Sequence, residues 1–305
     1  MSGASLQSAL PLPGLPAPTT ASPGRLAWRR FRSHRGAWWA LLVVAAVVLV
    51  ALSAGLLAPH DPVQQFRTHL LVPPAWSDGG SWRFVLGTDQ AGRDVLSRLM
   101  HGAQVSLMIA LLSVALSALP GTLLGLLAAY YRQALGTLIL RVMDVMMALP
   151  GLLLALVVIA ILGPGLVNTM LAIAIGSLPG TTRLARAAAL GELSRDYVQA
   201  ARAIGAGPAR ILLVNVLPNC LGPLIVNATL NFSSAIMEVA ALGFLGLGVQ
   251  APTPEWGTML SASRDVMHIA PWAAMWPGLA ILVTVLCVNL VGDGLRDAFD
   301  PRLRS

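Results

Sequence analysis

Few side chains in this 305-residue chain stand in patterns that could perform chemistry. All 20 basic residues are Arg, and without a Lys no P-loop can hold the β- and γ-phosphates of a nucleotide. Cys220 and Cys287 lie in apolar runs and form no CxxC or metal pattern. The His residues stand singly, and no Ser-His-Asp or paired-carboxylate pattern is recognisable. We therefore expect no catalytic residue, metal site or bound cofactor; any ATP that drives this chain is bound by another polypeptide.

Residues 196–219, called the knuckle below, carry the most specific local pattern. Asp196 can cap a short helix, Gly205 ends it, and Pro208 suits the first turn of a second helix. Alanines in the first helix leave little side-chain bulk. Such a compact helix–turn–helix can dock into a groove on a partner and transmit a rigid-body push. An ordinary loop with an amphipathic first turn fits the composition equally well.

Polar side chains within or beside apolar runs are the other candidates. Glu238 directly follows the uncharged run 211–237. A charge there is costly, so Glu238 either lines a transport pathway or lies at the membrane interface, wetted or paired with a partner. Asn231 is a candidate pathway residue as well, although Asn residues in such runs more often hydrogen-bond helix to helix.

Long apolar runs must position these residues. The chain is 56% hydrophobic and 11% charged, whereas a soluble domain carries about 25% charged residues. The uncharged runs are residues 36–58, 105–131, 145–182, 211–237 and 266–292. The third is too long for one helix and is broken at Gly163-Pro164-Gly165, so it gives two spans. We therefore predict an all-α integral membrane protein with six transmembrane helices.

The chain divides into parts on the same grounds. We expect a disordered and then basic tail (1–35), a first transmembrane helix (36–58), an external segment (59–102), a five-helix core containing the knuckle (103–294), and a second tail (295–305). Residues 132–144 are expected to be a short connection. With the N-terminus in the cytoplasm, fifteen Arg lie inside and five outside, which places both termini in the cytoplasm. The net charge of +7 therefore reflects topology and not nucleic-acid binding.

The knuckle resembles the EAA loop of ABC importer permeases, whose pattern is E-A-A-x3-G, nine residues, then I-x-L-P. Gln199-Ala200-Ala201, Gly205 and Leu217-Pro218 fall at the matching spacing. Gln199 replaces the Glu, keeping its shape but not its charge, and Asn215 replaces the Ile. The resemblance implies that the knuckle seats in a cleft of an ATPase subunit. The coupling residues would be Gln199, Ala200, Ala201, Gly205, Arg210, Leu217 and Pro218.

Three further stretches, residues 86–98, 241–257 and 289–302, look like the C-type subunit of the peptide and nickel branch of that family. The resemblance implies a type I ABC importer permease core with a cytoplasmic coupling helix, forming half of a pathway for short peptides in a bacterial inner membrane. It implies a second permease, two ATPase subunits that carry ATP and Mg²⁺, an external substrate-binding protein and membrane lipid as partners, and no nucleic acid.

Some alternatives stay open. Asp89, Arg93 and Asp94 could cap and orient the helix that follows them, or dock the external binding protein. The cargo could be nickel or glutathione instead of a peptide. A stand-alone secondary transporter would need coupling-ion sites in two related halves, and one internal acid without a two-fold repeat makes a poor match. A membrane enzyme would need a convergent reactive set that the sequence does not show.

Overall fold

The computed structural model describes residues 23–299, so the predictions for residues 1–22 and 300–305 lie outside it. The described chain is helical and contains no strand, only an isolated bridge between Thr88 and Asp94. Its helices are α1 (Pro23–Ser33), α2 (Arg35–Leu52), α3 (Ala54–Leu57), α4 (Val95–Tyr130), α5 (Ala134–Met146), α6 (Gly151–Leu162), α7 (Leu166–Leu193), α8 (Asp196–Ala203), α9 (Pro208–Arg210), a π-helix (Ile211–Val216), α10 (Leu217–Phe244), α11 (Trp256–Ser263), a 3₁₀ turn (Arg264–Val266) and α12 (Trp272–Phe299).

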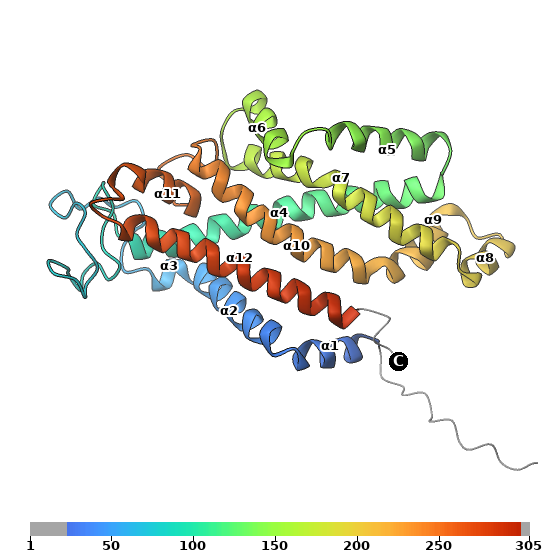
Figure 1. Cartoon of the computed structure of the whole chain (residues 1–305), viewed down its shortest axis with the longest axis horizontal. Helices are drawn as coiled ribbons and strands as arrows, with labels where there is room; N and C mark the ends of the chain where they lie inside the picture. Colours follow the sequence, from blue (N-terminus) through green and yellow to red (C-terminus); the bar gives the residue numbers. More distant parts are fainter. Residues whose placement is uncertain (1–22, 300–305) are drawn as a thin grey trace, which may run out of the picture.

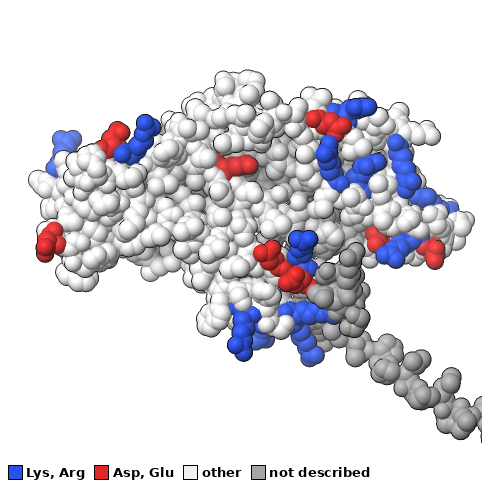
Figure 2. Space-filling view, in the orientation of Figure 1, with Lys and Arg blue, Asp and Glu red and all other residues white. Residues whose placement is uncertain are grey.

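The long helices form an elongated bundle, with α8 and α9 at one end and α11 at the other (Figure 1). Helix α4 packs along α7 and α10, and α12 packs between α10 and α2. A Cβ added at Gly125 of α4 would lie 2.5 Å from the carbonyl oxygen of Thr182 on α7, so these backbones approach as closely as only Gly permits. Charged side chains gather at both ends of the bundle and over α1 and the end of α12, and apart from one acidic patch the surface between them is uncharged (Figure 2).

Four helical stretches in the described chain are long and apolar enough to cross a membrane. They are α2, α4, the continuous stretch from α9 through α10, and α12. Helices α5 and α6 reach that threshold together but are bent by 87°, which gives a fifth span if the pair counts as one. Helix α7 is 28 residues long but carries Asn168, Arg183 and Arg186, and it is not among the apolar helices. The multi-pass helical architecture is therefore present, with four or five of the six predicted spans apparent by length and composition.

The predicted break at Gly163-Pro164-Gly165 is confirmed, because α6 ends at Leu162 and α7 begins at Leu166. Gly163 and Gly165 have φ of 85° and 146°, which L-residues rarely adopt.

The prediction of a connection over residues 132–144 is wrong, because α5 occupies most of it. The charged residues Arg132, Arg141 and Asp144 are more typical of a connection than of a membrane helix. In the structure Asp144 forms an ion pair with Arg183 of α7, so the acid is neutralised across the helix pair. For a similar reason α7 does not end near residue 182 but runs to Leu193, carrying its arginines within a helix.

The ends of other elements also differ from the prediction. Helix α4 begins at Val95, ten residues before the predicted second span, so residues 95–102 are helical and not part of an external loop. The last helix begins at Trp272 and not at residue 266, because Pro271 precedes it, and it continues to Phe299, into the predicted tail. The start of α4 and the end of α12 carry polar and charged side chains, so hydropathy alone does not reveal them.

Candidate coupling and pathway sites

The knuckle consists of α8, a tight turn, α9, the π-helix and the first residues of α10, and so has the helix–turn–helix form that the sequence predicts. Val198 is fully buried and packs in one cluster with Ile211 and Val216 of the π-helix, which fixes α8 against the root of α10. Gly205 ends α8 with φ of +83°, and a Cβ added there would meet no atom within 4 Å. The requirement for Gly at this position is therefore conformational and not steric.

Asp196 does not cap α8. It is the first residue of the helix, and Arg195 stands at the capping position without a side-chain cap bond. At the first turn a carboxylate still favours the helix dipole.

The π-helix follows from the proline in the EAA-like pattern. Pro218 has no N–H, so it cannot donate an intrahelical bond to Val214. The π-helix, Ile211–Val216, ends two residues before Pro218. Asn215, which stands where the family pattern has Ile, accepts at its backbone carbonyl from the side chain of Asn219 at 2.8 Å. Leu217 and Pro218 then begin α10. These two predicted coupling residues thus shape the junction and do not form its exposed tip.

The remaining coupling residues lie on the outer face of the knuckle. Gln199, Ala200 and Arg210 are exposed, and Ala201 is half-buried. The Nε2 of Gln199 donates to the carbonyl oxygen of Leu193, the last residue of α7, at 3.2 Å. A Glu there would have no proton to donate at neutral pH, so Gln gives this chain a tie between α8 and α7 that the family's Glu does not supply.

Two residues of the knuckle were missed by the sequence reasoning. Ile204 is 85% exposed at the tip of the turn, where a large apolar side chain suits a partner's groove. Tyr197 donates to Glu192 Oε2 at 2.6 Å and accepts from Asn219 Nδ2 at 3.1 Å, which connects α7, α8 and α10. Desolvation and the Glu192 hydrogen bond raise the pKa of Tyr197 to about 12. In the sequence, the large apolar Ile204 directly before the helix-ending Gly205 is the feature that could have indicated the tip.

Glu238 and Asn231 lie two turns apart on α10 and line the same pocket, of about 410 Å³. The break between α5 and α6 and a Gly- and Pro-containing stretch of α7 form its other walls. Glu238 is half-buried. A Cβ added at Gly151, the first residue of α6, would lie 3.8 Å from Oε1 of Glu238. Asn231 Nδ2 donates to Thr181 Oγ1 at 3.2 Å, the helix-to-helix bond that Asn in such a run predicts.

Asp89, Arg93 and Asp94 lie together but face inward. Asp89 accepts from the backbone N–H and from the Nε of Arg93, at 2.9 and 2.7 Å, and pairs with Arg98 Nε at 3.6 Å. Asp94 is 1% exposed and caps α4 by accepting from the N–H of Ser97 at 3.1 Å. The capping and orienting role is therefore confirmed for Asp94. Docking of a binding protein by these residues stays a prediction.

Glu255 is a buried cap at the same end of the bundle. It accepts from the backbone N–H groups of Gly257 and Thr258 at 2.7 and 2.9 Å, and from Ser106 Oγ of α4 at 3.0 Å. Burial raises the pKa of the Glu255 carboxyl, and these three hydrogen bonds oppose that rise. The side chain fixes α11 against α4 and is a structural residue.

Comparison with known proteins bears on these sites. Residues 121–305 match the binding-protein-dependent transport system inner membrane component family, and residues 22–74 match the N-terminal transmembrane domain of oligopeptide transport permease C. A di/tripeptide transport system permease protein, DppC, of Pseudomonas aeruginosa is 58% identical, covering 93% of this chain and 94% of its own. The dipeptide permease DppC of Escherichia coli K12 is 52% identical, with 95% and 96% covered.

A glutathione transport system permease, GsiD, of Escherichia coli is 42% identical over 91% of this chain and 90% of its own. The fold is similar to that of a chain in the inward-facing MetNI methionine ABC transporter, with a TM-score of 0.55 at 20% identity, covering 67% of this chain and 97% of that one. The full-length identities and the family match agree with the EAA-like knuckle, and the chain belongs to the binding-protein-dependent transport system inner membrane component family of ABC importer permeases.

Proposed function

We propose that this chain is one permease subunit of an ATP-driven importer of short peptides in a bacterial inner membrane. The observation that carries the peptide assignment is full-length identity of 52% and 58% to permeases named for dipeptides or di/tripeptides. Glutathione, itself a tripeptide derivative, is the second candidate cargo, because a permease named for it is 42% identical.

The chain crosses the membrane six times, through α2, α4, the bent α5–α6 pair, α7, α10 and α12. Both termini and the knuckle then lie in the cytoplasm, in accord with the excess of Arg on that side. Helix α7 is tolerated as a span because it packs between α4 and α10, and because the ion pair of Arg183 with Asp144 compensates one of its charges.

The knuckle couples this chain to a separate ATPase subunit that binds ATP and Mg²⁺. Closure of two such ATPases would press on the exposed face of α8 around Ile204. The push passes to α10 through the buried Val198 and through the hydrogen bond of Asn219 to Tyr197. Helix α10 also carries Glu238 and Asn231 at the pocket beside the α5–α6 break, so the same rigid element reaches from the ATPase to the pathway.

A second, homologous permease supplies the other half of the pathway, and an external binding protein delivers the cargo. In this arrangement the chain itself performs no ATP hydrolysis. Its part is to hold the coupling element and the pathway-lining helices in one packed unit.

Reconstitution of the whole transporter tests the proposal. Proteoliposomes with ATP inside and the binding protein outside are supplied with a radiolabelled dipeptide or with labelled glutathione. We expect ATP-dependent dipeptide uptake that an equal concentration of glutathione does not suppress. Uptake of glutathione alone would favour the second cargo. Uptake by this chain alone, without ATP, would contradict the coupling and favour a secondary transporter.

A further inference from the structure

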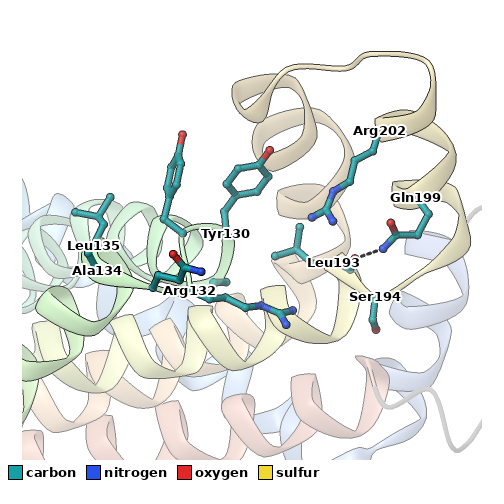
Figure 3. A pocket seen from close by; sticks show the side chains of 11 residues that line it. Tyr130, Arg132, Ala134, Leu135, Leu193, Ser194, Gln199 and Arg202 are labelled. Carbon is teal, nitrogen blue, oxygen red and sulfur yellow. Dashed lines mark hydrogen bonds between the residues drawn. The ribbon is translucent and has the colours of Figure 1, made fainter.

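A basic pocket lies beside the knuckle and is not part of the pathway. It has a volume of about 830 Å³ and opens between the end of α4, the start of α5 and the first helix of the knuckle, α8. Tyr130, Tyr131 and Arg132 line it from the α4–α5 turn, while Gln199 and Arg202 line it from α8 (Figure 3). No acidic residue is among those that line it.

The two arginines are poised to bind an anion. In Figure 3 the side chains of Arg132 and Arg202 extend into the same space from opposite sides. Arg202 is held with its guanidinium carbon 5.7 Å from the centre of the Tyr130 ring, an arrangement that leaves its N–H groups free to donate. Among the side chains that the structure describes, neither guanidinium has a carboxylate within 4.0 Å. Two guanidinium groups without a carboxylate partner favour a phosphate over a neutral ligand.

An exposed apolar stripe begins at the pocket and runs up α5. Its members are spaced by three, four and three residues, which places them on one face of the helix. They are Leu135, Leu138, Val142 and Val145, with exposed fractions of 42%, 62%, 48% and 74%. Leu135 is also a lining residue of the pocket. Ten residues of α-helix rise about 15 Å, which is about half of the 30 Å hydrocarbon core. The stripe therefore matches the depth of a single leaflet.

We propose that this pocket and stripe bind one anionic phospholipid, with the phosphate between Arg132 and Arg202 and the acyl chains along α5. The pocket alone would suit any phosphate, whereas the stripe that begins at Leu135 offers an apolar surface that acyl chains can use and a free anion cannot. Tyrosines at the end of a span are typical of the headgroup level, where such a lipid lies. A zwitterionic lipid fits less well, because its own cation competes for the phosphate.

The bound lipid would join the knuckle to the rest of the bundle. Arg202 is on α8, whereas Arg132 is in the turn that ends α4, so a shared phosphate restrains α8 from the membrane side. This consequence for coupling rests on the proposed orientation and on the proposed role of the knuckle. Lipid binding itself is measured without either.

The test titrates the purified, delipidated transporter with phosphatidylglycerol and with phosphatidylcholine, and follows bound lipid by native mass spectrometry. We expect preferential retention of phosphatidylglycerol, and Arg132→Gln and Arg202→Gln each to weaken it about fivefold, the loss of one cation near an anionic lipid. Arg195→Gln is the matched control, because Arg195 stands at the N-cap of the same helix, pairs with Glu192 at 3.7 Å and does not line the pocket. Retention by Arg202→Lys would show that the charge, and not the packing, is what matters.

Two arms separate a lipid from a free anion. Leu138→Asn should weaken phosphatidylglycerol binding, while Leu119→Asn, 71% exposed on α4 but outside the stripe, should not. Millimolar inorganic phosphate should leave the lipid in place. Displacement by phosphate together with no effect of Leu138→Asn would assign the pocket to a free anion and overturn the proposal. Equal lipid binding by the wild type and both Arg variants would also overturn the proposal. If the Arg202→Gln transporter then also lost its ATPase subunits, the pocket would be assigned to the contact with an ATPase.

Discussion

The two ends of the bundle use their polar side chains in opposite ways. At the loop end, formed by residues 54–94 and 245–271, Asp94 and Glu255 are each 1% exposed and cap α4 and α11. At the knuckle, Ala200, Ile204 and Arg210 are exposed. The buried carboxylates of the loop end therefore stabilise a fixed shape, while the knuckle exposes its outer face to a partner. Substitutions at the first should cost stability, and substitutions at the second should cost coupling.

The largest effect is expected at the loop end. Glu255→Ala removes one buried acceptor and leaves three donors, on Ser106, Gly257 and Thr258, without a protein partner. The free energy of unfolding should fall by about 3 kcal/mol or more. Thermal unfolding of the purified transporter, followed by the loss of monodisperse protein, measures this. A melting temperature within a degree of wild type would show that Glu255 is not a structural cap.

A large effect on coupling, with little on stability, is expected from Gly205→Val. Its φ of +83° disfavours any side chain, and a β-branched one most, so the turn should relax and move the tip of the knuckle. We expect cargo-stimulated ATPase activity to fall by roughly tenfold or more, about 1.4 kcal/mol of lost coupling. Gly207→Val is the matched control, since Gly207 has φ of −70° and equally open surroundings. Unchanged stimulation in Gly205→Val would remove the knuckle from the coupling route.

A smaller loss of coupling is expected from Tyr197→Phe, which deletes only the hydroxyl that joins Glu192 to Asn219. A hydrogen bond of this kind contributes about 1 kcal/mol, so ATP-driven uptake should fall by about fivefold. Because the pKa of Tyr197 is about 12, the hydroxyl stays protonated at pH 6 to 9, and the deficit should not vary over that range. A deficit that appears only at high pH would point to a different group.

The smallest effect is expected from Gln199→Glu, which restores the family's residue. The change removes the donor to Leu193 O and places a negative charge at the C-terminus of α7. The free energy of unfolding should fall by about 1 kcal/mol or less. A clear rise in stability would contradict this, and would mean that a carboxylate at position 199 pairs with a cation such as Arg132 or Arg202 of the same pocket.

The sequence was sufficient for the parts of the fold that depend on local chemistry. Uncharged runs, the Gly163-Pro164-Gly165 break and the knuckle with its helix-ending Gly205 are all visible from residue types and spacing. Helix α5 was missed because Asp144 is neutralised by Arg183, a partner 39 residues away that no local window contains.

The candidate sites, too, could be predicted where they depend on local sequence and not where they depend on how helices pack. The EAA-like spacing located the knuckle, but the ties of Tyr197 to Glu192 and Asn219 depend on how three helices meet. The basic pocket likewise joins Arg132 to Arg202 only because the end of α4 lies beside α8. Residue spacing cannot predict such contacts, because they depend on how several helices pack and not on one element.

Site-directed cross-linking at the tip of the knuckle tests the central claim most directly. Both native cysteines, Cys220 and Cys287, are buried, so a single exposed cysteine can be introduced with little background. In the intact transporter Ile204→Cys should form a cross-link to an ATPase subunit and thereby block ATP-driven uptake. Leu56→Cys, 90% exposed at the loop end, should give neither result. Normal uptake by Ile204→Cys, with no cross-link to any ATPase subunit, would contradict the account.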